Sequence, residues 1–196
     1  MIAEVVVAGV VLAGGAGRRM GGLDKAALQV GGVALLDRVL AAARPVCDRL
    51  VVVGPARPTE VPGVEFVMDD CPGGGPVPAI LAGLNACPGC DTLLVLATDL
   101  ALLLPEHLRL LLSELDRRPD VEAVAALDAE GPNPLLAAYR SSTLASRAAG
   151  LGLGPGAAAG RLLPDALWTV DLGPATLNVN RPEDLAAAER LVAEER

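Results

Sequence analysis

The fold and the site both depend on one stretch, Leu12-Ala13-Gly14-Gly15-Ala16-Gly17-Arg18-Arg19-Met20-Gly21-Gly22-Leu23-Asp24-Lys25. It follows the apolar run Val5–Leu12, whose β-branched residues predict a strand. Glycines let a backbone approach phosphate oxygens closely, and consecutive N–H groups in such a loop form an anion-binding concavity. Five glycines and three cations are more than a simple turn needs. The stretch therefore predicts a phosphate-binding loop after a strand.

Lys25 is the only lysine among 16 basic residues, and the others are all arginine. Lysine carries a compact charge on a flexible stem, whereas the arginine guanidinium is a planar fork. A single lysine in the glycine-rich loop thus indicates a position where the ammonium group matters. The loop is not a Walker A motif, because Lys25 follows Asp24 and no Ser or Thr comes after it. Met20 excludes the dinucleotide-binding fingerprint.

Length and composition limit the class of protein. A chain of 196 residues can bury one full core, so we expect a single domain over residues 1–196. Apolar residues make up 52% and charged residues 20%, which excludes a disordered chain. The net charge of −8 and the presence of only three aromatics, Phe66, Tyr139 and Trp168, argue against nucleic acid as a partner. The longest apolar run is too short to cross a bilayer and lacks the basic start of a secretory signal. We therefore expect a cytoplasmic protein with no membrane partner.

Short β-branched runs alternate with Ala- and Leu-rich stretches of helical period along the chain. The predicted strands are Val5–Leu12, Leu50–Val53, Val64–Met68, Leu93–Leu96, Val121–Leu127 and Trp168–Leu172. The predicted helices are Leu35–Ala43, Pro78–Cys87, Pro105–Arg117, Ser141–Ala149 and Pro182–Glu195. This alternation predicts an α/β fold, a three-layer sandwich with a largely parallel sheet, whose ligand crevice lies beyond the carboxyl ends of the strands. The Gly/Ala tract Gly150–Gly160 predicts a mobile loop.

The segment Cys87-Pro88-Gly89-Cys90 has the spacing of a redox pair or of half a zinc site. A structural zinc usually takes two such pairs, and a redox pair follows a strand, whereas this one precedes a predicted strand. We predict no zinc site here, and the sequence leaves a redox role open.

The glycine-rich stretch resembles the signature of the small nucleotidyltransferases, and it is most similar to that of the molybdenum cofactor guanylyltransferases. Four further segments resemble the family in order and spacing, so that the resemblance covers nearly the whole chain. They are Val67–Leu84 with its Asp69-Asp70 and Gly73-Gly74-Gly75-Pro76, Leu94–Asp99, Asn133–Tyr139, and the ending Asn178-Val179-Asn180-Arg181-Pro182-Glu183-Asp184-Leu185.

The resemblance implies a Rossmann-like nucleotidyltransferase fold and a reaction in which GMP from GTP joins the terminal phosphate of molybdopterin with release of pyrophosphate. It implies Mg²⁺ as cofactor, GTP and molybdopterin as partners, transient contact with cofactor-synthesis enzymes or acceptor apoenzymes, and a monomer or weak oligomer. Three alternatives stay open. They are a sibling that uses CTP on the same cofactor, an enzyme that transfers a nucleotide to another small phosphate such as phospholactate or a sugar phosphate, and a catalytically inactive nucleotide-binding adaptor.

The resemblance also implies roles for residues near the start of the chain and at the ends of two strands. Lys25 and Arg19 would hold the triphosphate, and the backbone of residues 12–15 (Leu12, Ala13, Gly14, Gly15) would line the nucleotide. Asp70 would contact the nucleotide, with Asp69 as the alternative. Asp99 ends an apolar strand and so projects into the crevice, where its hard carboxylate suits Mg²⁺.

The last motif and one departure concern the acceptor and the base. Asn178 and Asn180 alternate along an extended stretch, so we expect both amides to face one side and to contact the acceptor phosphate or the pterin. Gly54 stands where the family has an asparagine near the base. The sequence therefore leaves the choice between GTP and CTP open.

Overall fold

The computed structural model describes residues 5–14 and 24–194. Its strands are β1 (Val7–Leu12), β2 (Gln29–Val30), β3 (Val33–Ala34), β4 (Arg49–Val53), β5 (Val64–Val67), β6 (Thr92–Ala97), β7 (Ala123–Asp128), β8 (Gly131–Arg140) and β9 (Leu167–Asp171). Its α-helices are α1 (Leu35–Ala43), α2 (Pro76–Asn85), α3 (Pro105–Asp116), α4 (Ser141–Gly150) and α5 (Pro182–Glu194). Short 3-10 helices are η2 (Lys25–Ala27), η3 (Arg44–Val46), η4 (Ala159–Leu162) and η5 (Gly173–Thr176).

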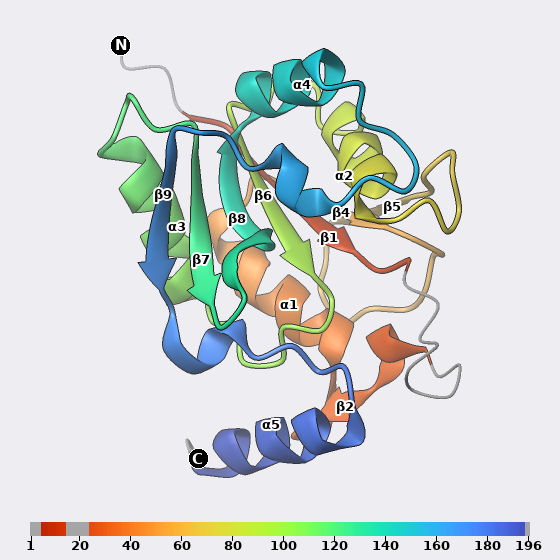
Figure 1. The fold of residues 1–196 in the computed structure, drawn as a ribbon. Coiled ribbons are helices and arrows are strands. Elements are labelled where there is room, and N and C mark those ends of the chain that lie inside the picture. The colour runs from red at the N-terminus through yellow and green to blue at the C-terminus, as the bar shows by residue number, and fades with distance from the viewer. Residues whose placement is uncertain (1–4, 15–23, 195–196) are drawn as a thin grey trace.

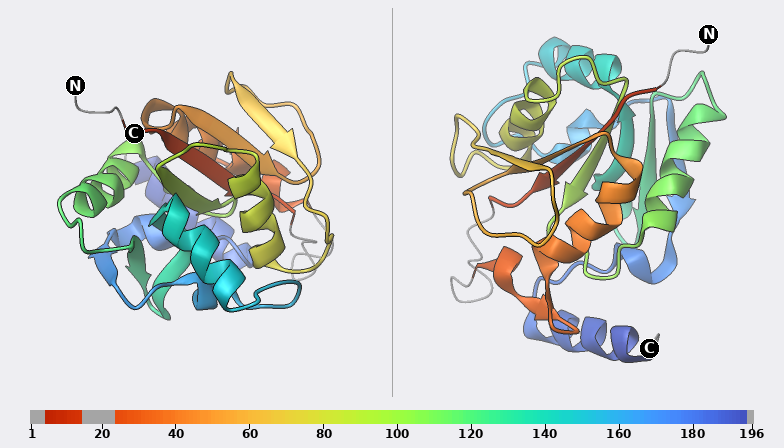
Figure 2. Two further views of the ribbon diagram at one scale, coloured as in Figure 1. Left: turned by 90° about the horizontal axis from the view of Figure 1, so that it is seen from above. Right: turned by 180° about the vertical axis from the view of Figure 1, so that it is seen from behind.

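Seven of these strands form one sheet in the order β5-β4-β1-β6-β8-β7-β9. Strands β5, β4, β1 and β6 pair in parallel, as do β7 and β9, and β8 runs antiparallel to both of its neighbours. Helices α1 and α3 cover one face of the sheet, and α2 and α4 cover the other (Figures 1 and 2). The predicted three-layer sandwich with a largely parallel sheet is confirmed.

The two cores follow from the strand period of two. In β6, Leu94 and Leu96 pack with α1 and α3, whereas Leu93 and Val95 pack with α2 and α4. All four side chains are fully buried. A strand that is apolar on both faces is typical of a sheet covered on both sides.

Helix α2 lies unusually close to β1 at Gly83. A Cβ atom built on Gly83 would stand 2.3 Å from Val10 Cγ1, a separation that packed atoms do not tolerate. Because β1 ends at the predicted phosphate loop, this contact fixes the strand that carries the loop.

A third, smaller core lies beyond the carboxyl ends of the central strands. There α5 packs with the β2–β3 hairpin, which lies beside it at the bottom of Figure 1. The extended stretch before α5 is tied to the loop after β6, since the Val179 N–H donates to the Asp99 carbonyl at 2.9 Å and residue 178 forms a β-bridge with Leu100. This tie brings the end of the chain to the strand ends where the site was predicted.

The predicted elements lie close to those of the structure. Helix α1 has the predicted bounds, whereas α2 begins at Pro76, two residues before the predicted start, with Gly75 as its N-cap. Both Pro76 and Pro78 fit the first turn, whose N–H groups have no partner within a helix. The tract Gly150–Gly160, predicted as a mobile loop, begins with the last residue of α4. It contacts the rest of the protein at two places, because Leu153 is buried and the Gly156 N–H donates to the Gly74 carbonyl at 2.7 Å.

The cysteine pair lies between α2 and β6, and all four cysteines of the chain are free thiols. Burial raises the pKa of the Cys87 thiol to about 11, so this thiol is protonated and a weak nucleophile near neutral pH. Cys90 Sγ lies 3.1 Å from Ser141 Oγ.

Within residues 5–14 and 24–194, no helix is both long and apolar enough to span a membrane.

Candidate active site

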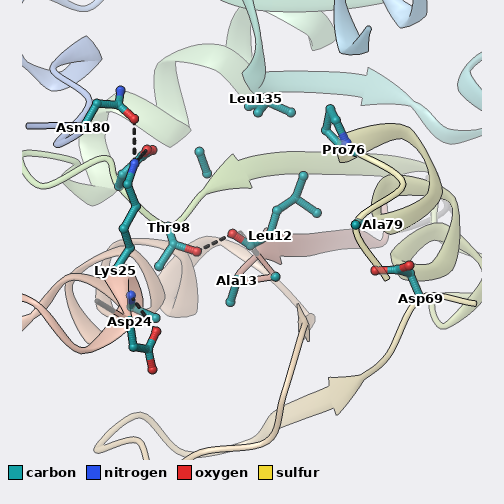
Figure 3. A pocket seen from close by; sticks show the side chains of 16 residues that line it. Leu12, Ala13, Asp24, Lys25, Asp69, Pro76, Ala79, Thr98, Leu135 and Asn180 are labelled. Atoms are coloured by element: carbon teal, nitrogen blue, oxygen red, sulfur yellow. Dashed lines mark hydrogen bonds and ion pairs between the residues drawn. The ribbon is translucent and has the colours of Figure 1, made fainter. Parts of the chain in front are cut away.

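A pocket of about 620 Å³ opens beyond the carboxyl ends of β1, β5 and β6. This is the edge at which parallel α/β sheets bind ligands, and the volume suits a nucleotide-sized molecule. Figure 3 shows the lining side chains. The described residues that line the pocket are Leu12, Ala13, Gly14, Asp24, Lys25, Ala26, Asp69, Gly73, Gly75, Pro76, Ala79, Ala97, Thr98, Asp99, Leu135 and Asn180.

The backbone at the end of β1 forms the floor between the two ends of the pocket. The Ala13 N–H donates to the Val53 carbonyl at 2.9 Å, and the Thr98 hydroxyl donates to the Leu12 carbonyl. Gly54 has φ +151°, and a Cβ atom there would stand 2.9 Å from the Ala13 carbonyl carbon. Only glycine permits this approach, so position 54 offers the pocket no side chain.

One end of the pocket, here called the lysine end, consists of Lys25, Asp99 and Asn180. Lys25 Nζ lies 2.9 Å from Asp99 Oδ2 and donates a hydrogen bond of 2.6 Å to Asn180 Oδ1 (Figure 3). The Lys25 and Asp99 side chains are only 20% and 17% exposed. The sequence predicted a role for each of these residues, and the structure brings Asp99 and Asn180 into contact with Lys25.

Hydrogen bonds from neighbouring aspartates hold the backbone next to Lys25 and at Asn180 in place. Asp24 caps η2, because its Oδ1 accepts the Ala26 N–H at 3.1 Å. Asp184 Oδ2 accepts the Asn180 N–H at 2.9 Å and the Arg181 N–H at 2.8 Å at the start of α5. Each cap satisfies N–H groups that a helix start leaves unpaired.

Asp99 is the described residue best suited to a metal ion. Its Oδ1 is buried and accepts no hydrogen bond from any group that the structure describes. A buried carboxylate oxygen without a partner is costly, which fits an oxygen that serves as a ligand. The described residues hold no group of three or more His, Cys, Asp or Glu able to bind a metal. Mg²⁺ is commonly held by one or two carboxylates together with substrate phosphates and waters, and Asp99 fits that donor set.

The opposite end of the pocket, here called the glycine end, consists of Asp69, Gly73, Gly75 and Pro76. Asp69 Oδ1 accepts the Cys71 N–H at 2.8 Å, and its side chain lines the pocket. The sequence resemblance favours Asp70 as the residue that contacts the nucleotide. In the structure Asp70 is exposed and is not among the residues that line the pocket. Strand β5 ends at Val67 and the chain bends at residue 70, so the turn after the strand leaves Asp69 against the pocket and Asp70 toward solvent.

Asn178 also differs from its expected position. Its Nδ2 donates to the Thr176 carbonyl at 3.2 Å, and the side chain is not among those that line the pocket. The alternation that put Asn178 and Asn180 on one side does not hold in this short stretch between η5 and α5, which pairs only through the bridge at residue 178. Arg19 and Gly15 lie outside the described residues.

One cation near the pocket was missed by the sequence reasoning. Arg57 Nη1 pairs with Asp24 Oδ2, and this hydrogen bond holds the pKa of the Asp24 carboxyl below its usual value. No motif marks Arg57, which is 33 residues from Asp24. Its place after β4, at the carboxyl edge of the sheet, is the signal that could have found it.

Known proteins resemble this chain over most of its length. The family model described as MobA-like NTP transferase domain matches residues 9–163. The molybdenum cofactor guanylyltransferase of Nitrobacter hamburgensis is 31% identical over 198 residues, with 94% of each chain covered. A probable molybdenum cofactor guanylyltransferase of Deinococcus radiodurans is 37% identical over 182 residues, with 90% of each covered.

A solved structure agrees with these relatives. The molybdopterin-guanine dinucleotide biosynthesis protein A of Archaeoglobus fulgidus matches with a TM-score of 0.70 and 25% identity, over 95% of this chain and 99% of that one. The resemblance seen in the sequence motifs and the expected nucleotidyltransferase fold are thereby confirmed. The chain belongs to the family of MobA-like NTP transferase domains.

Proposed function

We propose that the chain is a molybdenum cofactor guanylyltransferase, which transfers GMP from GTP to the terminal phosphate of molybdopterin and releases pyrophosphate. The observation that carries the proposal is the lysine end, where the only lysine of the chain meets a strand-end carboxylate with an unpaired oxygen. Relatives named for this activity, at 31% and 37% identity, support the choice of substrates.

In the proposed reaction an oxygen of the acceptor phosphate attacks the α-phosphorus of GTP. A new P–O bond forms, the bond to the bridging oxygen of the β-phosphate breaks, and its electron pair leaves with pyrophosphate. Such a transfer needs positioning and charge neutralisation more than covalent help from the protein. The Lys25 ammonium would contact phosphate oxygens whose negative charge grows in the transition state. The backbone of residues 12–14 would hold the nucleotide against the end of β1.

The charges of the pocket explain why a divalent ion belongs in the proposal. The described lining contains three carboxylates, those of Asp24, Asp69 and Asp99, against the single ammonium of Lys25. That balance repels a triphosphate, and Lys25 is already paired with Asp99. Mg²⁺, when bound, would supply the positive charge that draws the phosphates together. Asp99 would hold it through the unpaired Oδ1, and Lys25 would then turn to the phosphates.

The experiment that tests the proposal measures pyrophosphate release with each of the four ribonucleoside triphosphates, with and without molybdopterin. We expect release with GTP, and only when molybdopterin is present. Preferential release with CTP would make the protein the cytidylyltransferase sibling. This outcome is tested because Gly54 has no side chain where the family has an asparagine near the base. Release with GTP and a sugar phosphate but not with molybdopterin would replace the acceptor. No release with any combination would indicate a nucleotide-binding adaptor.

A further inference from the structure

We infer that Arg57 is a positioning residue for polyphosphate binding, acting through Asp24 on the start of η2 and so on Lys25. The inference rests on the proposed function, because it takes the pocket to be a polyphosphate site. It concerns a residue that none of the sequence motifs includes.

Each carboxylate oxygen of Asp24 has a hydrogen-bond partner. Oδ2 pairs with Arg57 Nη1, and Oδ1 caps η2 through the Ala26 N–H. Helix η2 has only three residues, too few to hold its own shape without such a cap. Because Lys25 is the first residue of η2, whatever fixes the Asp24 carboxylate also fixes the base of the Lys25 side chain.

The loop that carries Arg57 is itself held at both ends. After β4, the Gly54 N–H donates to the Val67 carbonyl at 2.8 Å. Further along, the Thr59 hydroxyl donates to Asp37 on α1 and accepts the Val61 N–H at 3.1 Å. Arg57 is thus presented from a fixed loop and its side chain is only 17% exposed. A guanidinium ordered in advance loses little entropy when it orders its partner.

The same contact corrects the charge of the pocket wall. Asp24 lines the pocket, its side chain is 56% exposed, and it is ionised at neutral pH, as an aspartate of ordinary or lowered pKa is. An ionised carboxylate directly before Lys25 would weaken the attraction of that lysine for phosphate. The guanidinium of Arg57 offsets this charge and keeps Lys25 attractive to an anion.

A second ion pair, at the start of the strand that precedes the Arg57 loop, serves as a matched control. Arg49, at the start of β4, lies 3.2 Å from Glu65 of β5, and both side chains are well exposed at 40% and 53%. This pair sits at the end of β4 away from the pocket, because β4 runs from Arg49 toward Gly54. Substituting Arg49 removes the same charge as substituting Arg57 without touching the pocket wall.

The test uses the full chain and measures the dissociation constant of inorganic pyrophosphate by calorimetry in the presence of Mg²⁺. We expect Arg57→Gln to weaken binding about fivefold, the upper range for a partly exposed ion pair. Arg57→Lys should recover most of that loss. Arg49→Gln should change binding less than about twofold. Thermal unfolding of each variant verifies that it is folded.

A double-mutant cycle decides whether Arg57 acts through Asp24. In the background of Asp24→Asn, Arg57→Gln should have little further effect, because its partner charge is gone. A full fivefold loss in that background would overturn the inference and mean that Arg57 touches the phosphates directly. An equal loss in Arg49→Gln would reduce the effect to net charge, and a wild-type protein that does not bind pyrophosphate would overturn it outright.

Steady-state kinetics separate this inference from the proposed function. With GTP and molybdopterin, Arg57→Gln should raise the KM for GTP by the same factor and leave the KM for molybdopterin unchanged, a split that a general loss of structure would not give. If the wild type binds pyrophosphate yet releases none from GTP, the proposed function fails. The binding cycle still decides the role of Arg57 in that case.

Discussion

The two ends of the pocket are built in opposite ways. At the lysine end, Lys25 pairs with Asp99 and with Asn180, which come from distant parts of the chain, and Lys25 and Asn180 are 155 residues apart. At the glycine end, one continuous turn supplies Asp69, two glycines and a proline, so that backbone and shape dominate (Figure 3). A group that stabilises developing charge must be positioned by the whole fold, whereas a wall that decides which ligand fits can come from a local turn. We therefore expect substitutions at the lysine end to change turnover and those at the glycine end to change substrate choice.

Lys25→Met should have the largest effect. Removing the ammonium takes away a contact made to the charge of the transition state, and such contacts are typically worth about 10²–10³ in rate. The measurement is kcat for pyrophosphate release from GTP, with thermal unfolding to verify the fold. Arg49→Met removes one positive charge elsewhere and should retain the wild-type rate. An unchanged kcat in Lys25→Met would place the chemistry away from the lysine end.

Asp99→Asn should come next and should show a division between metal and nucleotide. It keeps the size of the side chain but removes the anionic ligand, so we expect activity to fall about 10² and the magnesium optimum to rise. When a chelator removes Mg²⁺, the affinity for GTP should stay the same or improve. Lys25 then has no anionic partner, and the carboxylate that repels the phosphates is gone. Asp116→Asn on the exposed side of α3 is the matched control. An active variant with an unaltered magnesium optimum would make Asp99 a structural turn residue and would point to Asp69 as the metal ligand.

At the glycine end, Asp69→Asn should reduce the preference for GTP. A carboxylate accepts hydrogen bonds from the N–H groups on the Watson–Crick edge of guanine, and an amide replaces part of that acceptor surface with donors. We expect the KM for GTP to rise about tenfold with kcat little changed, as for the loss of one hydrogen bond to a charged group. Asp70→Asn, at the exposed neighbour, should change KM less than about twofold. Equal effects of the two variants would show that Asp69 makes no specific contact with the base.

Periodicity and turn residues predicted most of the fold, but they did not predict the short strands β2 and β3 or the long strand β8. The long strand β8 was expected only from the resemblance at Asn133–Tyr139, since Pro132 and Pro134 break the usual strand pattern. Its antiparallel direction follows from the connection, because only two residues separate β7 from β8 and a parallel pair needs a long crossover. The direction could be recognised only after both strands were known.

The site was predicted residue by residue rather than as an arrangement. Lys25 and Asp99 stand out because each is a charged residue at the end of an apolar strand or glycine-rich loop. Their mutual contact joins residues that are 74 positions apart in the sequence, and no local pattern reports such a separation. The choice between Asp69 and Asp70 depends on how the chain turns after β5, which the sequence pattern alone does not fix. Arg57 acts across a tertiary contact and was therefore missed.

Asn178→Ala should have the smallest effect, and it separates two residues that the sequence treats alike. Asn180 belongs to the lysine end through its contact with Lys25, whereas Asn178 turns back to the Thr176 carbonyl and lies at neither end of the pocket. We expect Asn178→Ala to change the KM for GTP and for molybdopterin less than about twofold, within the range of substitutions away from a site. Asn180→Ala should raise at least one of them several-fold, because Lys25 loses the acceptor that holds its ammonium in place. Steady-state kinetics of both variants, with each substrate varied in turn, decides the point. A selective rise in the KM for molybdopterin in Asn178→Ala would mean that the acceptor reaches past the lysine end to the bridge at Leu100, and the pocket would then extend along the stretch before α5.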